Sequence, residues 1–243
     1  MGLDRVYSKI NEDVKPFTFN QEVAVVFQNM IERSVPGYAI CLEMITLLSK
    51  KFLLPGKRVY DLGCSLGASL IAVAKAFEKD PLQLIGVDNS ASMLKECRTN
   101  LGNYNFVHTI TLLEADVETI TLSPCSAVVL NFTLQFVPLE NRDRLIKKIY
   151  EALLPNGILI LSEKIDFPDQ ETTDIFSTLH QRFKLSHGYT DLEISQKRTA
   201  LENVLVPETA DLHLKRLQKV GFKQCIPWFQ CLNFASYFAI KKS

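Results

Sequence analysis

Acidic and amide side chains stand at the ends of four successive strand-like segments of this sequence. The first segment is Val59-Tyr60-Asp61-Leu62-Gly63-Cys64-Ser65-Leu66-Gly67, where an acid precedes a turn of small residues and a helix. The next three segments end near Asp88, Asp116 and Asn131. An open α/β sheet binds ligands in the crevice outside the carboxyl ends of its strands. We therefore expect these side chains to meet at one edge of a sheet.

Each of these residues suits a different part of a nucleoside that carries an amino-acid tail. The carboxylate of Asp88 can accept hydrogen bonds from both ribose hydroxyl groups. Asp116 can accept one from an adenine amino group while the backbone N–H of Val117 meets a ring nitrogen, and Asn131 can pair with either end of an amino acid. Ser65 stands where a dinucleotide fingerprint needs glycine, which favours a ligand without a pyrophosphate.

The order of these residues resembles that of the S-adenosylmethionine-dependent methyltransferases. Taken singly, a glycine turn often reflects tight packing and a strand-end aspartate often caps a helix, so the prediction depends on their ordered recurrence. The resemblance implies S-adenosylmethionine as the cofactor. The matching features are Asp61 and Gly63, then Asp88, then Asp116, then Asn131, and the turn Leu154-Pro155-Asn156-Gly157 before the fifth strand.

Strand-like and helix-like segments alternate from residue 57 onward, which predicts an α/β fold with a mostly parallel sheet covered on both faces. We expect the Rossmann-like fold of class I S-adenosylmethionine methyltransferases, with seven strands, a C-terminal antiparallel hairpin and a helical lid. The expected strands are 58–62, 83–88, 110–114, 127–132, 158–163, 223–229 and 233–240, and the expected helices between them are 66–77, 91–101, 143–153 and 210–220.

We expect one S-adenosylmethionine-binding domain over residues 1–243, with an N-terminal helical cap at about 17–52 and a helical insertion at about 166–206 as the lid. Residues 1–19 are predicted to form a partly ordered arm. In the cap, Asn20 is expected to cap one helix, and a break at Pro36 and Gly37 is expected to place Tyr38 on a loop before a second helix.

Composition excludes several other classes of protein. Lys and Arg number 27, as do Asp and Glu, so the broad basic surface that nucleic-acid binding requires is not expected. Six cysteines without a CxxC pair are read as reduced thiols. We expect no metal site, with the four histidines at the surface or at helix caps, because they lack ligand spacing. Without an apolar leader or a membrane span, we expect a cytoplasmic location.

A closer resemblance, to the carboxy-S-adenosyl-L-methionine synthase family, extends from about residue 17 to the end. It implies transfer of a carboxylate from prephenate to S-adenosylmethionine, giving carboxy-S-adenosyl-L-methionine for wobble-uridine modification of tRNA, and a homodimer. The segments that carry it are 30–38, 60–68, 129–136, Leu192-Glu193-Ile194-Ser195-Gln196-Lys197-Arg198, 201–204 and 228–231. The cofactor contacts that it implies are Tyr38, Gly63, Cys64, Ser65, Asp88, Asn89, Asp116, Val117, Asn131 and Arg198, and we expect Cys64 to contribute its backbone N–H.

The resemblance gives Arg198 the central chemical role. A guanidinium beside the sulfonium methyl group can grip an added carboxylate bidentately, which favours the carboxylated product over the cationic substrate. In this hypothesis the hydroxyl group released from prephenate removes a methyl proton and the departing carbon dioxide is captured, so no protein nucleophile is needed. Taken alone, an arginine in a charged helix is typical of a solvated residue. Candidates to hold the carboxylates of prephenate are Lys197, Arg33 and Lys164.

Two other functions share the cofactor motifs. One is an ordinary methyltransferase that acts on a small molecule, which differs only in its acceptor pocket. The other is a non-catalytic subunit that binds S-adenosylmethionine and supports a partner enzyme. A tRNA methyltransferase is less favoured, because the sequence has neither a basic tract nor an appended RNA-binding domain.

The substitution Arg198→Ala separates the carboxylating enzyme from the ordinary methyltransferase. We expect it to abolish retention of carboxy-S-adenosyl-L-methionine, with a loss of affinity of at least about tenfold, because the charge-assisted hydrogen bonds to the carboxylate disappear. Calorimetric titration of the variant with the carboxylated nucleoside measures this. Wild-type affinity in the variant would contradict the role given to Arg198.

Overall fold

A parallel sheet extended by an antiparallel pair forms the centre of the molecule. The computed structural model describes residues 2–54 and 56–242. The strand order is β3-β2-β1-β4-β5-β8-β7, with β6 paired to β5 off this path. The strands are β1 Arg58–Leu62, β2 Gln83–Asp88, β3 Thr109–Glu114, β4 Cys125–Asn131, β5 Leu153–Asp166, β6 Glu208–Thr209, β7 Gln224–Cys231 and β8 Phe234–Ile240.

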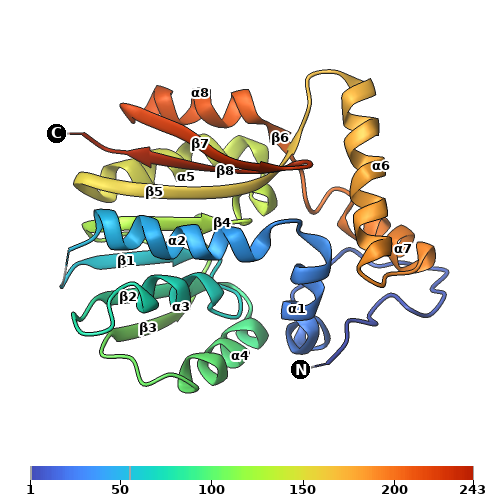
Figure 1. The fold of residues 1–243 in the computed structure, drawn as a ribbon, viewed down its shortest axis with the longest axis horizontal. Coiled ribbons are helices and arrows are strands. Elements are labelled where there is room, and N and C mark those ends of the chain that lie inside the picture. Colours follow the sequence, from blue (N-terminus) through green and yellow to red (C-terminus); the bar gives the residue numbers. More distant parts are fainter. Residues whose placement is uncertain (1, 55, 243) are drawn as a thin grey trace.

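Helices cover both faces of this sheet, and two more form a lid. In Figure 1 the lid helices α6 and α7 and the N-terminal helix α1 stand beyond the carboxyl ends of β1 and β4. The helices are α1 Gln21–Ser34, α2 Tyr38–Phe52, α3 Ala68–Lys75, α4 Ala91–Gly102, α5 Leu139–Ala152, α6 Gln170–Ser186, α7 Asp191–Leu201 and α8 Ala210–Val220, with a short 3-10 helix η1 at Leu134–Phe136.

Two apolar clusters separate the faces of the sheet. Residues of α5 and α8 pack on one face and residues of α2, α3 and α4 on the other. The central strands contribute to both clusters, since Val128 of β4 belongs to the first and Val129 to the second. Continuous apolar runs are typical of strands buried on both sides. The predicted fold class is therefore confirmed.

The strand count differs from the prediction, and several element boundaries shift, two of them by four or five residues. The two-residue strand β6 raises the number of strands from seven to eight, because Glu208 and Thr209 pair with the end of β5. Strand β5 begins at Leu153, five residues before the predicted start, because Leu153 pairs with Cys125 of β4 across an irregularity in the register. Helix α5 begins at Leu139, directly after Pro138.

The predicted cap of the first helix is confirmed, and the last helix ends at a glycine. Asn20 caps α1 by accepting a hydrogen bond from the backbone N–H of Val23. Gly221 ends α8 with a left-handed backbone (φ +112°), as expected of a residue that follows a helix. Tyr38, however, is the first residue of α2 and not part of a loop, because the turn at Gly37 (φ +77°) leads directly into the helix.

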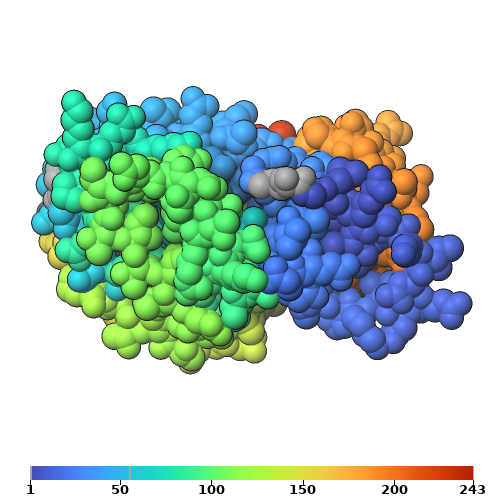
Figure 2. All heavy atoms as spheres, turned by 90° about the horizontal axis from the view of Figure 1, so that it is seen from below, coloured from blue at the N-terminus to red at the C-terminus, as the bar shows by residue number. Residues whose placement is uncertain are grey.

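The N-terminal arm, predicted to be partly ordered, is packed against the lid. Asp4 is 1% exposed, and the amide N–H of Phe17 donates to Ala200 O of α7 at 2.8 Å. The side chain of Gln196 donates to the backbone oxygens of Tyr7 and Lys9. Figure 2 shows the arm, in dark blue, lying against the lid in orange. The partners of the arm are thus about 185 positions away in sequence, so local pattern cannot reveal them.

No helix in the described ranges, 2–54 and 56–242, is long and apolar enough to cross a lipid bilayer.

Arg142 of α5 fastens the loop after β4 to β6. Its guanidinium, 1% exposed, donates to Val137 O at 2.8 Å, to Val206 O at 2.8 Å and to a carboxylate oxygen of Glu208 at 2.6 Å. The guanidinium thus supplies the donors for the Glu208 carboxylate and for both carbonyl oxygens. Removing this cation leaves several buried acceptors without a donor.

We expect Arg142→Ala to lower the free energy of unfolding by about 3–5 kcal/mol, the range found when one partner of a buried ion pair is removed. Arg144→Ala on the same helix is the control, because that side chain is 69% exposed and lies 3.7 Å from its partner Glu118, so about 0.5 kcal/mol is expected. Urea denaturation followed by circular dichroism measures both changes. Similar losses for the two variants would refute the structural role of Arg142.

Candidate active site

A cavity of about 800 Å³ lies between the carboxyl edge of the sheet and the lid. It brings together nine of the ten predicted contact residues, because the loops after β1, β2, β3 and β4 open onto the same edge. Arg198 alone is not among the lining residues. The nine are Tyr38, Gly63, Cys64, Ser65, Asp88, Asn89, Asp116, Val117 and Asn131.

The turn after β1 is fixed by backbone hydrogen bonds to the neighbouring strand. The N–H groups of Gly63 and Cys64 both donate to Val87 O, at 2.8 and 2.9 Å. Gly63 has φ +78°, and a side chain there would collide with Thr133, so only glycine fits. The expectation that the backbone N–H of Cys64 faces the ligand is wrong, because Val87 already accepts it.

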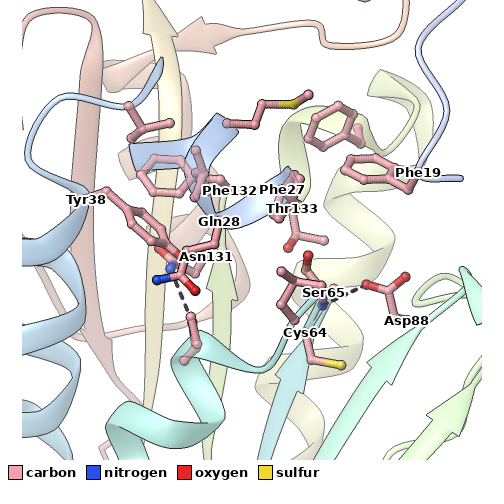
Figure 3. Close-up of a pocket in the computed structure, with 18 of the residues that line it drawn as sticks. Phe19, Phe27, Gln28, Tyr38, Cys64, Ser65, Asp88, Asn131, Phe132 and Thr133 are labelled. Atoms are coloured by element: carbon pink, nitrogen blue, oxygen red, sulfur yellow. Dashed lines mark hydrogen bonds between the residues drawn. The ribbon is translucent and has the colours of Figure 1, made fainter. Parts of the chain in front are cut away.

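Asp88 is held in a defined orientation at the end of β2. One carboxylate oxygen accepts the backbone N–H of Ser65 at 2.9 Å (Figure 3), and the other accepts the N–H of Ser90 at 2.9 Å. Burial raises the pKa of Asp88, and these two hydrogen bonds oppose the rise. Each oxygen keeps a free lone pair. This geometry suits a pair of ribose hydroxyl groups.

Two buried acceptors without donors lie near the ends of β4 and β1, and of these Asn131 lines the cavity whereas Asp61 does not. Asn131 Nδ2 donates to Ser69 Oγ at 3.2 Å, whereas its Oδ1 has no partner. Asp61 Oδ2 on the neighbouring strand also has none, and burial together with the charge of Asp88 raises the pKa of Asp61 to about 8. These atoms are unpaired with respect to the described residues. A buried acceptor without a donor is costly, so an ammonium group bound here would be favourable.

The backbone after Asn131 is strained in a way that fixes this amide. Phe132 has φ +62°, and its N–H donates to Ser162 O at 2.7 Å. A left-handed backbone is unusual for an aromatic residue and is typical of functional sites. The rings of Tyr38 and Phe132 lie 6.2 Å apart beside Asn131, as Figure 3 shows.

Asp116 and Val117 stand at the outer rim of the cavity. Asp116 is exposed, and one of its carboxylate oxygens accepts the N–H of Glu118 at 2.7 Å. The carbonyl oxygen of Val117 accepts Lys148 Nζ at 2.9 Å. The second carboxylate oxygen of Asp116 and the N–H of Val117 have no recorded partner among the described residues. They are therefore free for the adenine contacts predicted for them.

Arg198 is exposed and does not line the cavity of its own chain, whereas the adjacent Lys197 is buried and lines the cavity. The charge of Arg198 nevertheless lowers the pKa of Lys164 and of Lys184, which both line the cavity, so it lies near this end of the site. Lys184 was not predicted from the sequence. It stands four positions after His180 on α6, so the two side chains lie on the same face of that helix, and this spacing is the local feature that could have pointed to it.

Two of the histidines are buried, contrary to the expectation that all four are surface or capping residues. His180 is 7% exposed, and its Nε2 lies 2.7 Å from Ser34 O, while His213 is 1% exposed. Burial lowers the pKa of both, to about 3 for His180 and about 4 for His213. The described part of the chain contains no group of three or more side chains of the metal-binding types placed to share an ion.

We expect the two ends of the site to be separable by ligand truncation. Asn131→Ala should raise the Kd for S-adenosylmethionine about tenfold but leave binding of 5′-methylthioadenosine unchanged, because that ligand lacks the amino-acid tail. Asp88→Ala should weaken both ligands, which share the ribose. Asp80→Ala, at an exposed position, is the control. Isothermal titration calorimetry measures each Kd, and equal effects of Asn131→Ala on the two ligands would contradict the assignment.

Comparison with solved structures agrees with this architecture. Human N-acetylserotonin methyltransferase in complex with SAM superposes with a TM-score of 0.63 at 14% identity, covering 92% of this chain and 56% of that one. A putative S-adenosyl-L-methionine-dependent methyltransferase from Methanococcus maripaludis gives 0.59 at 19% identity, covering 97% and 98%. At these identities the likeness shows the fold.

Sequence comparison is more specific. Residues 59–157 match the methyltransferase domain family. A carboxy-S-adenosyl-L-methionine synthase from Aliivibrio fischeri is 46% identical over 238 residues, which cover 98% of each chain. One from Haemophilus ducreyi is 46% identical over 243 residues and covers both chains completely. With such identity along its whole length, the chain belongs to the carboxy-S-adenosyl-L-methionine synthase family of S-adenosylmethionine-dependent transferases.

Proposed function

We propose that this chain converts S-adenosylmethionine and prephenate to carboxy-S-adenosyl-L-methionine, phenylpyruvate and water, and so supplies the donor for carboxymethoxy modification of wobble uridine in tRNA. The observation that carries the proposal is the cavity. It joins nucleoside-binding side chains at the sheet edge to an end lined by three lysines, and the full-length relatives are named for this product.

The reaction balances without a nucleophile from the protein. Prephenate loses its hydroxyl group and its ring carboxyl group and becomes phenylpyruvate. The hydroxide takes a proton from the sulfonium methyl group and leaves as water, while the carbon dioxide forms a carbon–carbon bond to the same methyl carbon. The tasks left to the chain are to orient the two reactants and to exclude water, which are effects of proximity and desolvation.

The proposed cofactor contacts divide by ligand part. Asp88 and Asn89 hold the ribose, Asp116 and Val117 the adenine, and Asn131 the amino-acid tail. Three further groups complete the set, namely the turn at Gly63, Cys64 and Ser65, the ring of Tyr38, and Arg198 at the carboxylate. Among these, Asp88 has the strongest support, because both of its oxygens are held by backbone N–H groups.

We further propose that the protein is a homodimer in the cytoplasm. The exposure of Arg198 supports the dimer. Its guanidinium does not line the cavity of its own chain and is therefore available to the site of a second subunit. Within each subunit, residues 1–243 would act as one domain, with the cap at about 17–52 and the insertion at about 166–206 closing the site. In this account the partners are small molecules and a second copy of the chain, with no direct contact to nucleic acid or membrane and no metal.

Isotope transfer tests the proposed reaction. Incubation of the protein with methyl-labelled S-adenosylmethionine and prephenate should yield a labelled nucleoside that is heavier by one carboxyl group, together with phenylpyruvate in equal amount. Mass spectrometry measures both products. Omission of prephenate is the control. Unchanged S-adenosylmethionine would overturn the proposal, and loss of the labelled methyl group to an acceptor would instead identify an ordinary methyltransferase.

A further inference from the structure

Three lysines from three different elements converge on the lid end of the cavity. Lys164 lies near the end of β5, Lys184 near the end of α6 and Lys197 in α7, and all three line the cavity. His180 also lines the cavity, and the charges of all three lysines lower its pKa. Such a convergence of like charges is unfavourable in the absence of an anion.

The ammonium groups of Lys164 and Lys184 have no partner in the part of the chain that the structure describes. No hydrogen bond and no ion pair is formed by either Nζ atom among the described residues, 2–54 and 56–242. Both side chains are half-buried, and burial is the main cause of a lowered pKa in each, to about 8 for Lys184. Asp166 opposes this effect at Lys164, but no carboxylate does so at Lys184. Two partly desolvated cations therefore line the cavity without a hydrogen-bonded or ion-paired partner among the described residues.

Lys197 differs, because it is anchored. Its Nζ donates to Ser34 Oγ at 3.0 Å and to the hydroxyl oxygen of Tyr189 at 3.4 Å, and it lies 3.9 Å from a carboxylate oxygen of Asp4. Tyr189 in turn donates to Asp4. This network ties the N-terminal arm, α1 and α7 together, so the position of Lys197 is set by the packed lid. Lys164 and Lys184 are the cations left for a ligand.

Aromatic side chains form the wall next to these cations. Phe132 and Phe234 pack with Cys41 in one buried cluster, with their ring centroids 6.0 Å apart. The ring of His180 lies 5.0 Å from that of Phe234 in an edge-to-face arrangement. Its Nε2 lies at hydrogen-bond distance from the carbonyl oxygen of Ser34, so this nitrogen carries the proton and the ring presents an uncharged surface. The ligand that fits is a ring with anionic groups.

We propose that Lys164 and Lys184 form a carboxylate-binding subsite that holds a cyclic dicarboxylate against Phe132 and Phe234, beside the cofactor. This inference deepens the proposed function and rests on it for the identity of the dicarboxylate, prephenate. In this proposal the carboxylates are bound by the two lysines whose ammonium groups have no partner among the described residues. Lys197 is then a positioning residue that acts by holding the lid in place.

Direct binding tests the subsite without requiring turnover. Prephenate is titrated calorimetrically into protein loaded with S-adenosylhomocysteine, which has no methyl group to react. We expect Lys164→Gln and Lys184→Gln each to raise the Kd for prephenate about tenfold or more, because each removes a charge-assisted hydrogen bond. Lys184→Arg should retain much of the affinity. The Kd for S-adenosylhomocysteine and the melting temperature should stay as in the wild type.

Lys147→Gln is the matched control, because Lys147 on α5 is 69% exposed and does not line the cavity. Wild-type affinity for prephenate in both cavity variants, or no binding by the wild type, would overturn the subsite. A separate outcome concerns the proposed function. If the wild type binds prephenate through these lysines but forms no carboxylated nucleoside, the subsite stands and the proposed reaction fails.

Discussion

The constraint on which the rest depends is a pair of lysines at the lid end of one cavity, Lys164 and Lys184, whose ammonium groups have no ion-pair partner among the described residues. The other end of the cavity has the reverse character, since Asn131 presents a buried acceptor without a donor among the described residues and Asp88 presents a carboxylate. A ligand that fits both ends places the ammonium group of an amino-acid tail on one side and meets an anion on the other. An S-adenosylmethionine with a dicarboxylic acid beside its sulfonium group meets both requirements, whereas an acceptor without charge would leave Lys164 and Lys184 unpaired.

The polarity of the cavity follows from the topology. Parallel strands deliver their loops to one edge, so acceptors accumulate at the ends of β1, β2 and β4. The lysines come from the opposite side, from α6 and α7 and from the extension of β5 beyond its pairing with β4. The lid is held over the edge by the buried network of Asp4, Arg33, Tyr189 and Lys197, in which Arg33 donates to Asp4 O at 3.1 Å and lies 3.8 Å from the Tyr189 ring centroid. The arm and the lid therefore position the cationic end together.

The sequence was sufficient for the features that local pattern determines. Asp88 and Asn131 could be predicted because each ends a strand that its run of apolar residues identifies in the sequence. The carboxyl ends of parallel strands lie at the same edge of the sheet, so the two residues were expected there together. The caps at Asn20 and Gly221 follow from residue type alone. Boundaries were less accurate where pairing decided them, as at the start of β5.

Burial imposed by distant segments could not be predicted. His180 stands in a stretch of α6 whose sequence is mostly polar, and its contacts with Phe234, 54 positions later, and with Ser34 on α1 bury it. Asp4 reads as part of a solvated arm until its partners, near positions 33, 189 and 197, are known. Arg198 was recognised through a resemblance, and the single chain places its neighbour Lys197 on the cavity instead. Which side of a short helix faces a cavity is decided by tertiary packing, not by helical period.

The most direct test of the central claim is the mass of the nucleoside that remains bound when the protein is purified. A cavity with acceptors at one end and free lysines at the other should retain the carboxylated form of S-adenosylmethionine, heavier than S-adenosylmethionine by one carboxyl group. Mass spectrometry of the denatured protein would show it. Bound S-adenosylmethionine or S-adenosylhomocysteine alone, after expression in cells that make prephenate, would contradict the account.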